Sequence, residues 1–311
     1  MPLPKLEYSI GSRPTGYLLA FEPFLYNQEA FLALKDYPIQ SFYAINHQKR
    51  SIEARIHFTI REQQDGTLQA ISLPELPFGS LEYSTSLTNE QLSDFLAFVR
   101  EQLTQQQVRS IEIRDCIPSY RTDIKIFYQV LQELGFLVKD EQVNYHISVD
   151  SYSLLLKMKA GQKGRLAKSI KAEFIVVKEP VEKLCEVYRF IEMSYQTRQR
   201  KLSIPLRDLQ KYAEAFPDRY LLFSVCRSQD RVASCIAVQV SHSIVYTFYY
   251  TALLTYSSYS PTVLLLSHIY RYCQSNELAL LDLGIGSESI QNFKRRMGGV
   301  ASYKKSYLLK W

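Results

Sequence analysis

Tyr246-Thr-Phe-Tyr-Tyr-Thr-Ala-Leu253 opens the stretch of sequence that decides the fold. This segment has the pattern of a strand, and it precedes an apolar helix (261–273), the strand Leu278-Ala-Leu-Leu-Asp-Leu-Gly284 and a basic helix (287–297). A strand, a crossover helix, a strand and a second helix in this order hold a ligand beyond the carboxyl ends of the strands. The stretch therefore predicts a substrate cleft in the C-terminal half of the chain.

The composition is that of an ordinary folded protein with room for two domains. Hydrophobic residues make up 46% of the 311-residue chain and charged residues 22%, which excludes an intrinsically disordered protein. A chain of this length exceeds most single hydrophobic cores. A basic segment begins after Asp150, and we place the domain boundary there, with domains at residues 1–150 and 151–311.

The charge balance favours anionic ligands. Thirty-seven lysines and arginines against 31 aspartates and glutamates leave a net charge of +6, a mild excess that suits nucleotides, cofactor phosphates or RNA. A protein dedicated to duplex DNA is normally more basic, so no duplex DNA partner is expected.

Two features predict a cytoplasmic protein without a transmembrane segment. No Asp, Glu, Lys or Arg occurs from Val232 to Tyr270, but polar residues and Pro261 interrupt this run before it reaches the ~18 apolar residues of a membrane span. We interpret the run as buried strands and a buried helix. The five cysteines are widely spaced without a CxxC pair, as in reduced intracellular proteins, and Met1–Lys5 lacks a signal-peptide pattern.

The two halves of the chain show the same order of elements. Thr88-Asn-Glu-Gln91 is a capping box that begins a helix in the first half, as Pro261 begins one in the second. Strands of the first half have counterparts at an offset of about 160 to 170 residues, namely 54–59 with 221–225, 79–85 with 247–253, and the strand at Ile111 with that at Leu280. This order and spacing indicate an internal duplication.

Several common catalytic motifs are missing from the sequence. Gly284-Ile-Gly286 lies between a strand and a helix, the place of a dinucleotide fingerprint, but Ser289 stands where the third glycine belongs. We interpret this motif as a tight turn. The chain has no P-loop, no GxSxG elbow and no HExxH, and its five histidines lie far apart, so we predict no metal site.

Lys294 lies at the edge of the apolar face of the last helix. Ile290, Phe293 and Met297 define that face at about 100° per residue, and Lys294 lies beside it while Arg295 points away. Two interpretations stay open. Either the stem packs and the ammonium reaches solvent, or the ammonium points at a ligand above the strand ends.

The segment Lys163-Gly-Arg-Leu-Ala-Lys-Ser-Ile-Lys171 forms a second cluster of cations. Leu166 and Ile170 lie one helical turn apart, with Arg165 and Lys168 to their sides. The segment is either a solvated, charged helix or a contact for phosphate or RNA, to which clustered cations are attracted.

The order of these motifs resembles that of the FemAB-like branch of the GNAT-fold acyltransferases, over most of the chain. The motifs that carry the resemblance are a Leu-Pro-Phe-Gly79 turn, the basic segment 163–171, Tyr-Ser-Pro261 before an apolar helix, Leu-Leu-Asp-Leu-Gly284, and Asn-Phe-Lys294-Arg-Arg-Met-Gly298. The resemblance implies an α+β fold of two tandem GNAT-like domains, each a twisted, mixed, mostly antiparallel sheet flanked by helices.

The resemblance also implies a reaction, the transfer of an acyl or aminoacyl group from a thioester or tRNA ester to a small-molecule or peptide amine, often in peptidoglycan or cell-envelope synthesis. Lys294 matches the lysine of the family's Phe-Lys pattern and is the candidate catalytic cation that would stabilise the oxyanion. Arg165 and Lys168 match the family's basic run and would hold an anionic substrate such as tRNA. Tyr249 and Tyr250 would line the acceptor pocket.

The donor stays open. Many GNAT enzymes grip the pyrophosphate of acetyl-CoA with a Q/R-x-x-G-x-G/A loop, but this chain has Thr255-Tyr-Ser-Ser-Tyr-Ser260 between strand and helix. We expect no tightly bound cofactor, and either acyl-CoA or aminoacyl-tRNA as a co-substrate. The competing prediction is a non-catalytic protein whose degenerate GNAT cleft binds RNA or an acyl carrier.

Overall fold

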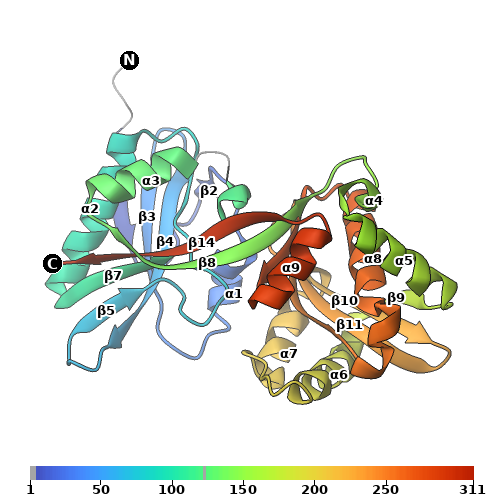
Figure 1. Cartoon of the computed structure of the whole chain (residues 1–311). Coiled ribbons are helices and arrows are strands. Elements are labelled where there is room, and N and C mark those ends of the chain that lie inside the picture. The colour runs from blue at the N-terminus through green and yellow to red at the C-terminus, as the bar shows by residue number, and fades with distance from the viewer. Residues whose placement is uncertain (1–4, 122–123) are drawn as a thin grey trace. The chain divides into compact units, whose positions relative to one another are not determined.

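The computed structural model describes residues 5–121 and 124–311 (Figure 1). The chain divides into two compact units, one formed by the residues up to Gln142 together with Tyr303–Trp311, the other by Val143–Ser302. This division falls before the predicted boundary at residue 150, because one continuous strand, β8 (Leu137–Ser148), runs from the first unit into the second. The last strand, β14 (Val300–Lys310), returns the chain to the first unit.

The first unit is built on a mostly antiparallel sheet. Before β8, its elements in chain order are β1 (Glu7–Ile10), β2 (Leu18–Leu19), α1 (Glu29–Leu32), β3 (Gln40–Asn46), β4 (Ser51–Glu62), β5 (Leu68–Ile71), β6 (Glu82–Tyr83), α2 (Asn89–Gln105), β7 (Val108–Arg114) and α3 (Ile124–Glu133). Neighbouring strands pair in the order β1–β3–β4–β5–β7–β14, and among these pairs only β5 and β7 are parallel. The short strand β6 also pairs with β4.

The second unit repeats this plan. After β8 its elements are α4 (Leu154–Lys157), α5 (Ala160–Lys171), β9 (Ile175–Glu179), α6 (Leu184–Gln196), α7 (Leu206–Ala215), β10 (Tyr220–Arg227), β11 (Asp230–Gln239), β12 (Ile244–Ala252), α8 (Pro261–Ser275), β13 (Leu280–Ile285) and α9 (Glu288–Arg296). The strand order is β8–β13–β12–β11–β10–β9, and among these pairs only β12 and β13 are parallel.

The equivalence of the two units refines the predicted repeat. In each unit a parallel pair is joined by one crossover helix, α2 between the β5–β6 segment and β7, and α8 between β12 and β13. Two of the predicted correspondences between the halves agree with this topology, that of the strand at Ile111 with the strand at Leu280 and that of 79–85 with 247–253. The predicted correspondence of 54–59 with 221–225 is wrong. Residues 54–59 belong to β4, which pairs with β6 as β11 pairs with β12, so the counterpart of β4 is β11 and not β10.

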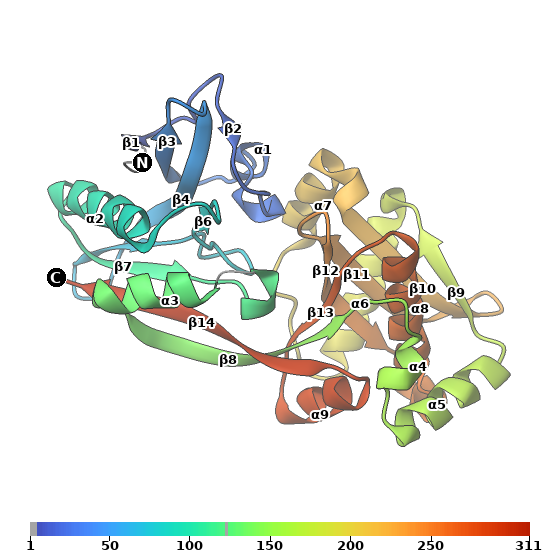
Figure 2. The same ribbon diagram turned by 90° about the horizontal axis from the view of Figure 1, so that it is seen from above.

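Each unit buries its own hydrophobic core. In the second unit, α8 packs on β10 and β11, and α6 packs on β11 and β12 (Figure 2). Val263, Leu266 and Ile269 of α8 belong to the same buried core cluster as Phe223 of β10. The uncharged run from residue 232 to 270 thus forms two buried strands and a buried helix. Among the helices of the described residues, none is both long and apolar enough to cross a membrane.

Candidate active site

The parallel strands β12 and β13 pair over a short distance and then part. Ile244–Tyr246 lies opposite Leu280–Asp282. The Oγ1 hydroxyl of Thr247 donates to the carbonyl oxygen of Asp282 at 2.9 Å, in place of the next backbone bond. On its other edge β13 follows β8, with a bulge between Asp282 and Gly284. The parting of the strands leaves a gap at their carboxyl ends, where a crossover connection places ligand sites.

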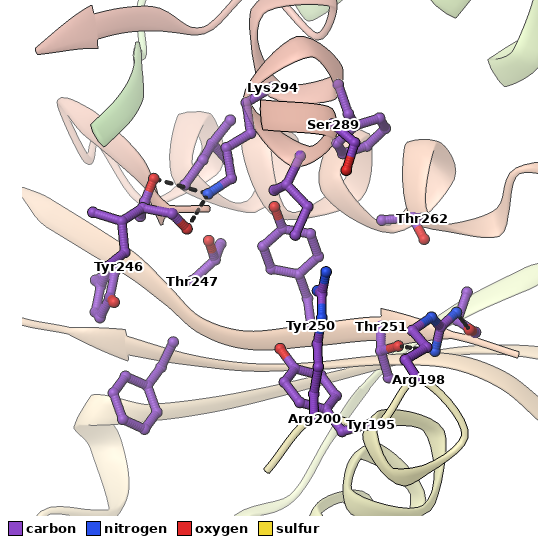
Figure 3. Close-up of a pocket in the computed structure, with 17 residues that line it drawn as sticks. Tyr195, Arg198, Arg200, Tyr246, Thr247, Tyr250, Thr251, Thr262, Ser289 and Lys294 are labelled. Carbon is purple, nitrogen blue, oxygen red and sulfur yellow. Dashed lines mark hydrogen bonds between the residues drawn. The ribbon is translucent and has the colours of Figure 1, made fainter. Parts of the chain in front are cut away.

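A cavity of about 310 Å³ occupies this gap (Figure 3). All of its walls come from the second unit: the ends of β12 and β13, helix α9, the end of α6 with the loop that follows, and the first turn of α8. The lining side chains that the chemistry below uses are Tyr195, Arg198, Arg200, Tyr246, Tyr250 and Lys294.

The Gly284-Ile-Gly286 turn shapes one end of the cavity. Gly284 has φ of 73°, its N–H donates to Asp282 Oδ1 at 2.6 Å, and a Cβ there would lie 3.1 Å from the Tyr246 ring. A Cβ on Gly286 would lie only 2.6 Å from Ile290, so glycine lets α9 approach the strand end. Both glycines have packing reasons, which supports their interpretation as a tight turn.

Lys294 projects from α9 into this turn with a side chain that is 1% exposed. Its Nζ donates to the carbonyl oxygens of Gly284 and Ile285, each at 2.8 Å (Figure 3). Burial lowers the pKa of Lys294 to about 8, and the Asp282 carboxylate partly opposes that shift. Because an ammonium carries three N–H donors, one donor remains for a group in the cavity.

The other polar groups of the cavity are hydroxyls and guanidinium groups. The Tyr250 hydroxyl is buried, has no hydrogen-bond partner among the described residues, and has a pKa raised by that burial. Arg198 donates to the carbonyl oxygens of Ser194 and Ala252, which fixes the end of α6 to β12. Arg200 is exposed at the rim. No aspartate or glutamate is among the described lining residues, so the cavity suits a carbonyl oxygen or an anion.

The structure brings two of the predicted site residues together, since Lys294 and Tyr250 both line the cavity. Tyr249 lies on the same strand, but its hydroxyl accepts hydrogen bonds from the N–H groups of Ser203 and Ile204 and does not line the cavity. Arg165 and Lys168 lie exposed on α5, outside the cavity lining. Lys168 instead holds its Nζ 5.4 Å from the centre of the Tyr259 ring.

Sequence reasoning missed several residues that build the site. Arg198 and Arg200 follow α6 as a basic pair, Arg198-Gln-Arg200, and this spacing was the available signal. Asn144, which donates to Asp282 Oδ1 at 2.7 Å, gave no signal because the two residues are far apart in the chain. The described residues hold no group of three or more His, Cys, Asp or Glu arranged for a metal ion.

Comparison with known proteins shows what the chain is similar to. Residues 161–295 match the family model described as the acetyltransferase (GNAT) domain. The chain is similar in structure to FemX, with a TM-score of 0.71 at 12% identity over 94% of both chains. It is also similar to L-PGS from Bacillus licheniformis, with a TM-score of 0.57 at 9% identity over 83% of this chain and 81% of that one.

A third similar structure is a tandem GNAT protein from the clavulanic acid biosynthesis pathway, with a TM-score of 0.50 at 10% identity over 88% of this chain and 83% of that one. A search of curated protein sequences found no match. These findings confirm the predicted α+β fold with tandem GNAT-like units, and the resemblance to the FemAB-like branch at the level of the fold.

Proposed function

We propose that this protein is an enzyme that transfers an acyl or aminoacyl group to an amine in the cavity of the second unit. The match to the GNAT domain model and the FemAB-like fold support this proposal. The acceptor is a small-molecule or peptide amine of cell-envelope synthesis, and the donor is a thioester or tRNA ester. The observation that carries the proposal is Lys294, a buried ammonium with one donor left to face a cavity whose described lining has no acidic side chain.

The proposed reaction is a direct attack on the carbonyl carbon of the donor. The neutral amine forms the new C–N bond, and the carbonyl electron pair moves to oxygen. The remaining N–H of Lys294 stabilises this oxyanion, more strongly in a buried site than in water. Collapse then breaks the C–S or C–O bond of the donor, and the proton lost by the attacking amine passes to the leaving sulfur or oxygen.

Two further groups orient the reactants in this proposal. The buried Tyr250 hydroxyl has no protein partner among the described residues, so a substrate carbonyl or amine supplies one. Arg200 at the rim holds the anionic part of the donor. Ser260, at φ 56°, precedes helix α8, which begins at Pro261, a residue with no N–H to offer a pyrophosphate. In this proposal the Arg200 guanidinium supplies part of the binding of that anion.

The first experiment finds the donor and then removes the cation. A thermal-shift screen over CoA thioesters and aminoacyl-tRNAs identifies the donor class, because a bound ligand raises the melting temperature. With that donor and an amine, we expect Lys294→Met to lower kcat by about 10²–10³-fold while donor affinity is retained. Arg295→Met is the matched control, since Arg295 is the adjacent, exposed cation of α9.

Two outcomes would contradict the proposal. Undiminished kcat in Lys294→Met removes the catalytic role of this lysine. Tight donor binding without transfer to any amine favours the alternative, a binding protein with a degenerate GNAT cleft.

A further inference from the structure

Helices α4 and α5 present an unusually basic surface of the second unit, outside the cavity described above. Residues 151–172 contain six lysines and arginines and no aspartate or glutamate. Lys157 pairs with Asp150 at 2.6 Å. The other five cations are exposed, and no ion pair involving them is seen among the described residues: Lys159, Lys163, Arg165, Lys168 and Lys171. A cluster of this kind attracts an anionic partner.

Large apolar side chains are exposed on the same two helices and the turn before them. Tyr152 is 63% exposed, Leu155 43%, Leu156 69% and Ile170 60%. Leu155 and Ile170 border one groove of about 140 Å³, whose other wall is α8 with Leu264, His268 and Arg271 among its residues. We call these cations and apolar side chains together the α4–α5 surface. Exposed apolar side chains that cluster mark an interaction site, whereas single exposed ones are common on any protein surface.

The surface is held rigidly on the fold. Helices α4 and α5 pack beside α8 in both views of the ribbon (Figure 1, Figure 2). The Oγ hydroxyl of Ser169, which is buried, donates to the carbonyl oxygens of Tyr259 and Ser260 at the start of α8. On α5 the buried face is formed by Gln162, Leu166 and Ser169, and Ile170 lies outside this face. Ile170 is therefore exposed although its helix is packed against the fold.

We propose that the α4–α5 surface docks on an anionic lipid bilayer, with the cations against the headgroups and Leu155, Leu156 and Ile170 inserted at the level of the upper acyl chains. Lysines and arginines near an anionic membrane attract it electrostatically, and adjacent apolar side chains add the burial that makes the contact stable. RNA would account for the cations alone, because aliphatic side chains gain little from a phosphate backbone. The bilayer accounts for both sets of residues.

The test measures binding of the full chain to vesicles, so its result does not depend on the proposed reaction. We expect co-sedimentation with vesicles of phosphatidylcholine and phosphatidylglycerol at 7:3, weakening as salt is added, and none with pure phosphatidylcholine. Lys163→Gln/Lys171→Gln should weaken binding by roughly 25-fold, about fivefold for each cation. Arg189→Gln/Arg207→Gln removes the same charge from exposed positions on α6 and α7 and should change binding less than twofold.

A second pair of variants separates a bilayer from RNA. Leu156→Gln/Ile170→Gln keeps the charge and should weaken vesicle binding about tenfold or more, because both side chains lose their insertion. Leu18→Gln/Leu137→Gln, at positions 77% and 73% exposed in other elements, is the matched control and should bind as the unaltered chain does.

Three results would overturn the proposal. One is no preference for vesicles with phosphatidylglycerol. Another is equal losses in the surface and control variants. The third is tRNA binding that the lysine variant abolishes while vesicle binding is unchanged in both surface variants. Melting temperatures of all variants are measured alongside, and we expect them to be unchanged since every altered side chain is exposed.

Discussion

Lys294 carries a charge at a position where a helix packed on a strand end usually carries an apolar side chain. Burial disfavours its charged form, and this cost is reflected in a pKa lowered to about 8. The carbonyl oxygens of Gly284 and Ile285, together with the negative charge of Asp282, keep the ammonium favourable enough to remain protonated at pH 7, at a ratio of about ten to one. The charge is therefore available for the proposed role in catalysis, at a cost in stability.

That cost predicts a pH dependence of folding. The folded pKa of about 8 lies below the ordinary value of 10.5, so between these values the unfolded state binds more protons and stability rises with pH. Lys294→Met has no ionisable side chain at this position, so its stability lacks this dependence on pH. We expect the free energy of unfolding of the unaltered chain to rise relative to that of Lys294→Met by about 2 kcal/mol from pH 7 to pH 9.5, measured by urea titration at each pH.

The comparison with Lys294→Met cancels other titrations, since the same tyrosines and cysteines are present in both proteins. A constant difference between the two proteins over that pH range would show that Lys294 titrates as an ordinary lysine. Such a result would contradict the burial of the Lys294 ammonium.

Tyr249 and Tyr250 are adjacent tyrosines that differ in their hydrogen bonding, and this difference gives a second prediction. The Tyr250 hydroxyl is buried without a partner among the described residues, whereas that of Tyr249 accepts from the N–H groups of Ser203 and Ile204. Tyr250→Phe should leave stability unchanged or raise it by up to about 1 kcal/mol, and lower kcat/KM by tenfold or more. Tyr249→Phe should instead cost about 1–3 kcal/mol by leaving two donors unpaired.

Urea unfolding and steady-state kinetics on the two variants decide this point. A loss of stability in Tyr250→Phe would mean that its hydroxyl has a partner in the folded protein. Undiminished activity in the same variant would remove Tyr250 from the proposed site.

At the scale of elements, the two units differ in what fills the gap beside the crossover helix. In the second unit β12 and β13 part around the cavity. In the first unit the chain between β5 and β6 lies beside β7: Ser72 N–H donates to Glu112 O and Gly79 N–H to Arg114 O, each at 2.9 Å. The Arg114 guanidinium donates to carbonyl oxygens of the same segment. The chain itself fills the first unit's gap, which favours a reaction site in the second.

Gly79 makes that filling possible and supplies a stability prediction. A Cβ there would lie 2.6 Å from the carbonyl carbon and oxygen of Ser72, both backbone atoms that cannot move aside cheaply. We expect Gly79→Ala to lower the free energy of unfolding by about 1–3 kcal/mol. Gly164→Ala is the control, because nothing lies within 4 Å of its Cβ on α5, and it should stabilise by up to about 1 kcal/mol. Equal effects in the two variants would contradict the close packing at Gly79.

Sequence patterns predicted those elements whose signals are local. The capping box at Thr88 forms as expected, with both reciprocal hydrogen bonds to Gln91. The basic helix predicted at 287–297 is α9, Glu288–Arg296. The strand β3 was not predicted, because the five prolines of the first forty residues indicated an irregular segment up to the start of this strand.

The site was predictable only in part, for a physical reason. Periodicity placed Lys294 at the edge of an apolar face, but the burial of its ammonium depends on the carbonyl oxygens of a turn on another element. Strand alternation places Tyr249 and Tyr250 on opposite faces of β12, but it could not tell which of them faces the cavity, since a bulge between Thr247 and Tyr249 breaks the alternation. The distance of Arg165 from the cavity is likewise set by tertiary packing.

At the scale of the whole molecule, the two units have separate hydrophobic cores. The core cluster around Phe127 draws its members from the first unit, and the one around Phe223 draws its members from the second. The strands that pass between the units contribute to each core only where they lie in its unit: β8 adds Tyr145 and Ile147 to the second core, and β14 adds Tyr307 and Leu309 to the first. In β8, for example, residues 137–142 are exposed and burial begins only at Val143 and beyond. Each unit therefore has its own hydrophobic core, as a domain that folds independently does.

The single tryptophan allows this independence to be measured. Trp311 lies in the first unit, with the Arg100 guanidinium 5.2 Å from its ring centre, so its fluorescence reports on that unit. Phe223→Ala removes a fully buried ring of the second unit and should cost it about 3–5 kcal/mol. In urea we expect the circular dichroism of this variant to show an early transition while the fluorescence midpoint stays within error. Phe127→Ala, at a fully buried position of the first unit, should move the fluorescence midpoint instead. Coincident shifts of both probes in both variants would mean that the chain unfolds as one cooperative unit, and the two cores would then stabilise each other through β8 and β14.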